Sequence, residues 1–161
     1  MSETPDRLRA LIAEWLPRLT AWEDDAAGQR SAPGRWSAKE VVGHLIDSGG
    51  VNLERFLRAL SSSDLVASGY PQDEWVAAQG FNEAPWEELL ALWHALNLHI
   101  ARVMERTPDS DLERPRVRHN LDQIAFRTVP PDRPTTLGYL MDDYVVHLEH
   151  HLQSLASGPS A

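Results

Sequence analysis

The sequence predicts an all-α fold: a four-helix bundle with one or two long crossover links, formed as a single domain over residues 1–161. Four stretches of roughly 18–24 residues repeat apolar side chains at spacings of three and four. No stretch alternates apolar and polar residues as a half-buried strand would, and no internal repeat divides the chain. Two of the three links are long, whereas a plain up-down-up-down bundle has short loops throughout.

The first helix is expected over about residues 5–24. Thr4 offers a capping hydroxyl, Pro5 suits the first helical position, and Asp6 places an acid in the first turn. Apolar residues then recur along one face as far as Trp22. Pro17 falls inside this pattern and should kink or split the helix, because proline has no backbone N–H to donate.

The second helix has the clearest start signal in the chain and continues to about residue 60. Ser37 and Glu40 form a capping box, and Trp36 can pack on Val41 as a hydrophobic staple. The pair Gly49-Gly50 weakens the helix by about 1 kcal/mol per glycine relative to alanine. A close approach of another backbone at this point would explain the pair.

The third and fourth helices are expected over about residues 85–106 and 136–155. Pro85 and the two acids after Trp86 open the third helix, and Thr135 or Thr136 caps the fourth. Residues 61–84 and 107–134 form the long links. Long ordered links in a compact domain often cover a functional site.

Composition narrows the functional classes. The chain has no cysteine, which excludes disulfides, thiolate metal sites and a cysteine nucleophile, so any thiol used in a reaction must come from outside. The 15 basic and 24 acidic residues give a net charge of −9, which argues against a nucleic-acid partner. No apolar run is long enough for a membrane span, and no signal peptide is recognisable, so the cytoplasm is the expected location.

The histidines carry the strongest functional signal. His147 and His151 are four residues apart on the fourth helix, so both imidazoles can reach one metal ion. Such a pair also arises by chance. His44 lies on the apolar face of the second helix, where a lone histidine is more often a hydrogen-bonded core residue than a ligand. Three inward imidazoles would be costly to bury without a shared cation, which favours one metal site.

Two motifs resemble those of the DinB-like superfamily (DinB/YfiT) of metal-binding four-helix bundles. The first is Trp36-Ser37-x-Lys39-Glu40-Val41-x-x-His44-Leu45-x-Asp47-Ser48. The second is Thr136-Leu137-Gly138-Tyr139-Leu140, followed by His147-x-x-x-His151. The resemblance implies one divalent ion, commonly zinc or nickel, on His44, His147 and His151, and it implies homodimers. Some relatives are transferases or isomerases that use low-molecular-weight thiols such as bacillithiol or mycothiol.

Three protein ligands leave a coordination position for water or substrate, which is the pattern of catalytic rather than structural zinc. The sequence therefore predicts a metal-dependent enzyme that activates a small thiol or water for attack on, or hydrolysis of, a small electrophilic substrate. Asp47 could orient an imidazole or be a solvated acid, and Tyr144 could donate to a substrate oxygen or be a core residue. The alternative is a metal-binding stress-response or binding module without turnover.

Several arginines between the third and fourth helices could clamp a substrate carboxylate. Acidic residues share this segment, so solvated ion pairs are the favoured interpretation. The arginines concerned are Arg114, Arg116, Arg118, Arg127 and Arg133.

Overall fold

The computed structural model describes residues 3–156 and residue 158, and the regular elements within them are all helices. The bundle consists of α1 (Thr4–Thr20), α3 (Ala38–Leu60), α5 (Trp86–Arg106) and α8 (Leu137–Ser154). The described residues form no β-strand, and pairing is limited to two isolated bridges. The predicted all-α four-helix bundle is confirmed.

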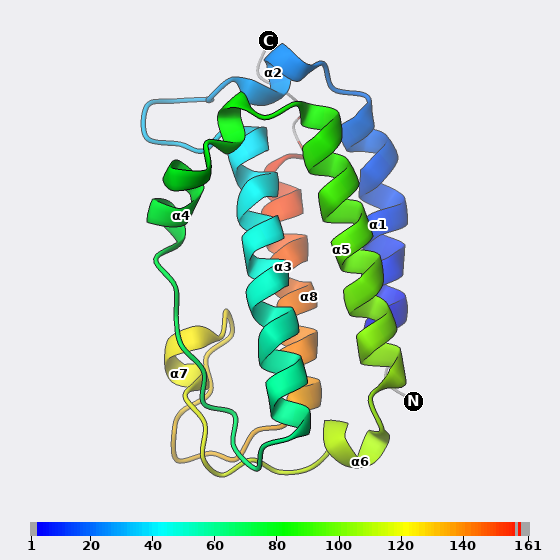
Figure 1. Ribbon diagram of the computed structural model, residues 1–161, viewed down its shortest axis with the longest axis vertical. Helices are drawn as coiled ribbons and strands as arrows, with labels where there is room; N and C mark the ends of the chain where they lie inside the picture. Colours follow the sequence, from blue (N-terminus) through cyan, green and yellow to red (C-terminus); the bar gives the residue numbers. More distant parts are fainter. Residues whose placement is uncertain (1–2, 157, 159–161) are drawn as a thin grey trace.

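The order of the helices requires one long crossover (Figure 1). In that view α1 and α8 run upward, whereas α3 and α5 run downward. The link from α3 to α5 therefore returns along the outside of the bundle from its lower to its upper end. The link from α5 to α8 stays at the lower end, because α5 ends there and α8 begins there.

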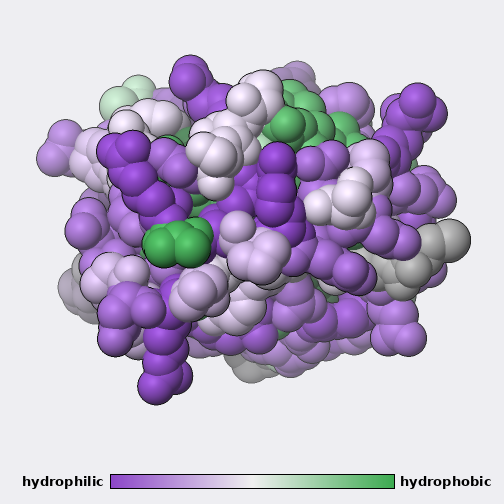
Figure 2. Space-filling view, turned by 90° about the horizontal axis from the view of Figure 1, so that it is seen from below, coloured by the Kyte–Doolittle hydropathy of each residue, from purple (hydrophilic) through white to green (hydrophobic). Residues whose placement is uncertain are grey.

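The long links contain short helices that the apolar periodicity did not predict. These elements are too short to show a repeated apolar stripe. They are α2 (Asp24–Gly28), α4 (Gln72–Gln79), the 3₁₀-helix η1 (Phe81–Glu83), α6 (Asp109–Leu112) and α7 (Leu121–Ile124). The lower end of the molecule, to which α6, α7 and their links contribute, is mostly hydrophilic, with hydrophobic residues only in small groups (Figure 2).

The core is the shared interior of the four long helices. Trp15 of α1, Phe56 of α3, Trp93 of α5 and Leu148 of α8 are all buried in it. Burial of these apolar stripes against one another is the main force that holds the bundle together. None of the described helices combines the length and the apolar character needed to cross a membrane.

The first helix differs from its prediction at its end. It continues through Pro17 without splitting, because Pro17 lies on the exposed face, where water can satisfy the carbonyl freed by the missing N–H. It ends at Thr20 rather than near residue 24. Trp22 lies beyond the helix and stacks on Trp86, with ring centroids 6.3 Å apart, so its apolar character serves packing in the turn.

The predicted caps fix the two helices that carry the histidines. Ser37 accepts from the backbone N–H of Glu40, whose carboxylate accepts from the backbone N–H of Ser37 in return. Arg30 donates to the same carboxylate from the connector. At α8 the capping residue is Thr136, whose hydroxyl accepts from the N–H of Tyr139.

Two glycines of α3 are required by close packing. A Cβ atom on Gly49 would lie 2.9 Å from Leu96 Cδ2, so what approaches here is a side chain and not the expected backbone, and Gly50 has open space at its Cβ position. A Cβ atom on Gly43 would lie 2.2 Å from the ring of Phe81, the residue through which η1 packs on α3.

We expect Gly43→Ala to lower the free energy of unfolding by about 2 kcal/mol, because the buried phenyl ring must move. Gly50→Ala is the matched control: Gly50 is exposed and has open space around its Cβ position, so alanine should stabilise α3 by up to about 1 kcal/mol. Urea denaturation of both variants checks the prediction. An increase in stability in both would contradict the packing role of Gly43.

Candidate metal centre

The structure brings the three predicted histidines to one place. Because α3 and α8 run in opposite directions, the first half of α3 lies beside the second half of α8 (Figure 1). His44 therefore meets His147 and His151, and one ring nitrogen of each lies within 4.8 Å of those of the others. His44 is only 1% exposed, and the two histidines of α8 are half-buried.

The spacing of one nitrogen pair suits a tetrahedral ion, and all three ligand nitrogens lie within 4.8 Å of one another. The Nε2 atoms of His44 and His147 are 3.3 Å apart. Two nitrogen ligands of tetrahedral zinc, each at about 2.05 Å, lie about 3.3 Å apart. The second ring nitrogen of His44, Nδ1, is buried without a hydrogen-bond partner, and Nε2 is the nitrogen that faces His147. The donor set therefore fits a divalent metal ion.

The electrostatic environment keeps the three imidazoles neutral. Burial, with a smaller effect from His151, lowers the pKa of His44 to about 4. Burial and the neighbouring histidines lower the pKa of His147 to about 3, and burial with His150 lowers the pKa of His151 to about 4. Since only the neutral imidazole binds metal, the site is ready to accept an ion at neutral pH.

Aromatic rings and one hydroxyl hold the histidines in place. Trp36 lies beside His44, with ring centroids 5.0 Å apart, and Phe126 lies beside His147 at 5.4 Å. Ser48 Oγ, one turn after His44 on α3, is 3.4 Å from His147 Nδ1. A contact of this kind on the second ring nitrogen fixes the orientation of a ligating imidazole.

Two cavities reach the histidines from different sides. One of about 200 Å³ includes His44 and His147 in its lining and is covered by residues 69–72 and 123–126 of the links. The other, of about 440 Å³, includes His151 and lies against the connector before α3. The long links therefore cover the site, as their length predicted.

Asp47 and Tyr144, the two tentative catalytic residues, do not contact the histidines through hydrogen bonds. The carboxylate of Asp47 accepts from Gln79 Nε2 at 2.8 and 2.9 Å, and burial raises its pKa. Tyr144 is buried and donates to Asn97 Oδ1 at 2.6 Å, and burial raises its pKa. Tyr144 lines the smaller cavity, but the core amide holds its hydroxyl proton.

The residues that sequence analysis missed lie on the same helix face as His44. Ser48, Asn52 and Arg55 follow at steps of four, four and three residues, and all of them line the smaller cavity. The signal was present in the sequence as polar residues that continue the inward face of the helix. Tyr70 enters the lining from the α3–α5 link, which no local pattern could place.

The arginines of the α5–α8 link mostly form the expected ion pairs. Arg114 pairs with Asp111, Arg118 with Asp64, and Arg127 with Asp142 and Asp143. Arg116 differs: it is buried and donates to the backbone carbonyls of Ala59 and Ser62 at the end of α3.

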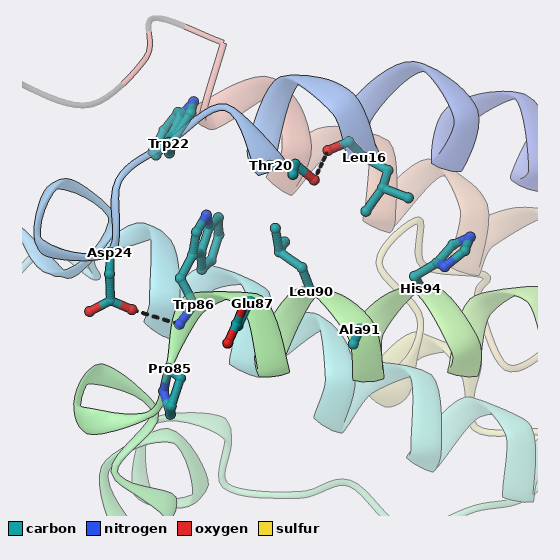
Figure 3. Close-up of a pocket in the computed structure, with 10 residues that line it drawn as sticks. All are labelled: Leu16, Thr20, Trp22, Asp24, Pro85, Trp86, Glu87, Leu90, Ala91 and His94. Carbon is teal, nitrogen blue, oxygen red and sulfur yellow. Dashed lines mark hydrogen bonds between the residues drawn. The ribbon is translucent and has the colours of Figure 1, made fainter.

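A cavity of about 560 Å³ lies away from the histidines, between the end of α1 and the start of α5. Figure 3 shows Trp22 and Trp86 at one end of it, with Leu90 and Leu16 further along. Trp86 donates its backbone N–H to Asp24, and Thr20 its hydroxyl to the Leu16 carbonyl. These polar groups are therefore engaged in ending one helix and starting the next.

Comparison with known proteins gives the family of the chain. No curated protein sequence matches it. Among solved structures, YfiT from Bacillus subtilis is similar with a TM-score of 0.77 and 20% identity, over 96% of this chain and 83% of that one. That protein is described as a probable metal-dependent hydrolase with an unusual four-helix bundle topology, and at this identity the likeness shows the fold. The sequence profile of the DinB superfamily matches residues 6–155, and the chain belongs to that superfamily.

Proposed function

We propose that this protein is a metal-dependent enzyme that uses water or a small thiol to attack a small electrophilic substrate. His44, His147 and His151 would hold one divalent ion, with zinc or nickel as the expected choices. An ion with three imidazole ligands and an open position lowers the pKa of water or a thiol and polarises a substrate oxygen. Homodimer formation stays a prediction from the family resemblance.

The observation that carries the proposal is the convergence of three neutral imidazoles beside a cavity. A purely structural site is closed by four protein ligands. Here, among the described residues, the cluster that could hold an ion consists of three histidines. Two of them line the cavity of about 200 Å³, so a small molecule in that cavity lies next to the place where the ion would be held.

The other residues of the cavity offer hydroxyl groups to a substrate and little free carboxylate. Ser48 holds His147 in position, and Tyr70 brings a phenol whose pKa is raised by burial. Asp143 is the acidic residue of the lining, but it accepts from the backbone N–H groups of Phe126 and Arg127 and from the Arg127 side chain. Because His44 and His147 would be occupied as ligands, proton transfer at the site would involve hydroxyl groups, such as that of Tyr70, rather than Asp143.

The fold does not decide whether the nucleophile is water or a thiol, and activity assays are needed to distinguish them. The structural similarity to YfiT, a probable metal-dependent hydrolase, supports water as the nucleophile. The family resemblance supports a low-molecular-weight thiol, which would enter as a second substrate because the chain has no cysteine. Zinc-loaded and nickel-loaded protein should be tested on small activated esters, and on glutathione, bacillithiol or mycothiol with a small electrophile.

We expect Ser48→Ala to lower turnover by about 10- to 100-fold, because His147 loses the group that fixes its orientation. Initial rates at saturating metal measure the effect. Ser61→Ala is the control, since Ser61 lies past the end of α3 and its hydroxyl donates to the carbonyl of Arg58, away from the histidines.

The assays can also give results that contradict the proposed activity. If the metal-loaded protein acts neither on the esters nor on the thiols, while substitution of the three histidines still lowers its stability, the chain is a metal-binding module without turnover. If thiol transfer is seen and ester hydrolysis is not, the nucleophile is the thiol.

A further inference from the structure

A polar stripe leads away from the metal centre along α3. His44, Ser48, Asn52 and Arg55 are all at least nine-tenths buried and all line the cavity of about 200 Å³. Their spacing puts them on one face of the helix. Asn52 Nδ2 donates hydrogen bonds to the backbone carbonyl and to the hydroxyl of Ser48. The stripe ends in a cation, Arg55, which is 8% exposed.

Arg55 is a buried cation without a carboxylate. Its two terminal nitrogens donate to Asn52 Oδ1 at 3.3 Å and to the carbonyl of Ser68 at 2.9 Å. Its Nε atom is buried and has no partner. No ion pair involves Arg55 among the residues that the structure describes, whereas Arg58, one turn later and exposed, pairs with Glu54. Burying a guanidinium without an anion is costly, so folding alone does not explain Arg55.

We propose that Arg55 binds a carboxylate group of the substrate, so that the enzyme acts on small molecules that carry one carboxylate. This inference rests on the proposed function, because it gives the substrate class for the same cavity. The guanidinium has five N–H donors in a fork that matches a carboxylate, and the structure uses two of its nitrogens. The unpartnered Nε–H is the donor that a carboxylate would engage.

The charge of the cavity favours a single negative charge on the ligand. Arg55 is the only Lys or Arg among the described lining residues. The acid of the lining, Asp143, is already neutralised by Arg127 and two backbone N–H groups. In the metal-free protein, this one free positive charge matches a carboxylate better than a doubly charged phosphate. The volume of about 200 Å³ is below the usual range for ligand pockets, which limits the substrate to a small molecule.

The stripe also predicts where the reacting group of the substrate lies. Arg55 follows His44 by eleven positions, and a helix rises about 1.5 Å per residue, but the arginine side chain leans toward the start of the helix. The contact of Arg55 with Asn52, one turn earlier, has that direction. Because the His44 side chain leans the same way, the two shifts largely cancel, and the carboxylate and the electrophilic atom should be separated by a distance on the order of 15 Å.

The test is a comparison of carboxylates with their neutral amides. Dissociation constants for butyrate, hexanoate and octanoate, and for the three corresponding primary amides, are measured by calorimetry on metal-free and zinc-loaded protein. We expect each bound carboxylate to be favoured over its amide by about tenfold or more in the wild type. Arg55→Gln should reduce this ratio to near one, and Arg55→Lys should reduce it several-fold because the fork is lost.

Arg58→Gln is the matched control, since it removes an exposed arginine of the same helix and should leave the ratio unchanged. If Arg55→Gln does not fold, Arg55→Lys decides the question. An unchanged ratio in the folded Arg55 variants, or no carboxylate preference in the wild type, overturns the proposal. Tighter binding of inorganic phosphate than of every carboxylate also overturns it.

The metal-free arm separates this inference from the proposed function. In metal-free protein, the preference for a carboxylate over its amide depends on Arg55 and not on a metal ion, which would itself attract carboxylates. If the Arg55 variant loses the carboxylate preference and the wild type shows no turnover, the carboxylate site is supported and the proposed enzymatic function is rejected. Turnover of a substrate that is equally active as acid and amide supports the enzyme and rejects the role of Arg55.

Discussion

Replacing His147 or His151 by alanine is expected to remove almost all bound metal from a protein that otherwise carries close to one divalent ion per chain. Each imidazole supplies one of three ligands, and the two that remain, one on α3 and one on α8, do not hold zinc against dialysis. The ring nitrogens already lie within 4.8 Å of one another, so small side-chain movements bring all three to one ion. Elemental analysis of the purified, dialysed variants measures the effect and identifies the metal.

The same substitutions should remove a large stabilisation. An ion present at a thousand times its dissociation constant stabilises the folded chain by on the order of 4 kcal/mol. For a domain of this size each kcal/mol shifts the melting temperature by about 2–4 °C, so the wild type should melt roughly 10 °C higher with zinc than without it. The variants should show almost no shift on addition of zinc.

His150→Ala is the closest control available in the chain. His150 precedes His151 directly but is exposed and lies outside the cluster of three. Its substitution should therefore leave the metal content unchanged. A wild type that takes up neither zinc nor nickel would contradict the three-histidine site, and so would equal metal content in the His150 and His151 variants.

Local sequence signals predicted the parts of the fold that depend on local chemistry. The capping box at Ser37 and the cap at Thr136 fixed the starts of α3 and α8. The step of four residues from His147 to His151 then placed two imidazoles on one face of α8. The meeting with His44 needed only the further condition that the two helices pack in opposite directions.

The parts that were missed depend on contacts between distant segments. The end of α1 was placed too late because Trp22 continues the apolar spacing, although its ring packs on Trp86 across the turn. The cover of the cavity depends on the α3–α5 link, where Leu65 bonds to the backbone of Arg118 and Asn120 far along the chain. The burial of Arg55 could not be predicted from the helix pattern, because it depends on this cover.

The acid sensitivity of the fold should come largely from the histidine cluster. In the folded chain, pKa values of about 3 to 4 keep the three imidazoles neutral, whereas in the unfolded chain they take up protons below about pH 6.5. Protons therefore favour the unfolded state between these values. The stability of the metal-free protein should be complete above pH 6.5 and fall as the pH decreases toward 4.

The expected size of this loss is on the order of 2 kcal/mol between pH 6.5 and 5 from His44 alone, at about 1.4 kcal/mol per pH unit. Urea denaturation of metal-free protein across this range measures it. His147→Gln should reduce the slope because one of the three groups is gone, and His99→Gln, an exposed histidine of α5, should not. A slope that His147→Gln leaves unchanged would place the acid sensitivity elsewhere in the chain.

The same low pKa values should make metal binding resistant to acid. A ligand histidine with an ordinary pKa of about 6.5 weakens metal binding about tenfold for each pH unit below that value. In the folded protein, protons compete for the three imidazoles only near pH 4 and below. The dissociation constant for zinc should therefore change little from pH 7 to pH 5, as measured by competition with a chromophoric chelator. A steep weakening over that range would mean that solvent reaches the imidazoles freely, and burial would then not be what keeps this site neutral and ready for the ion.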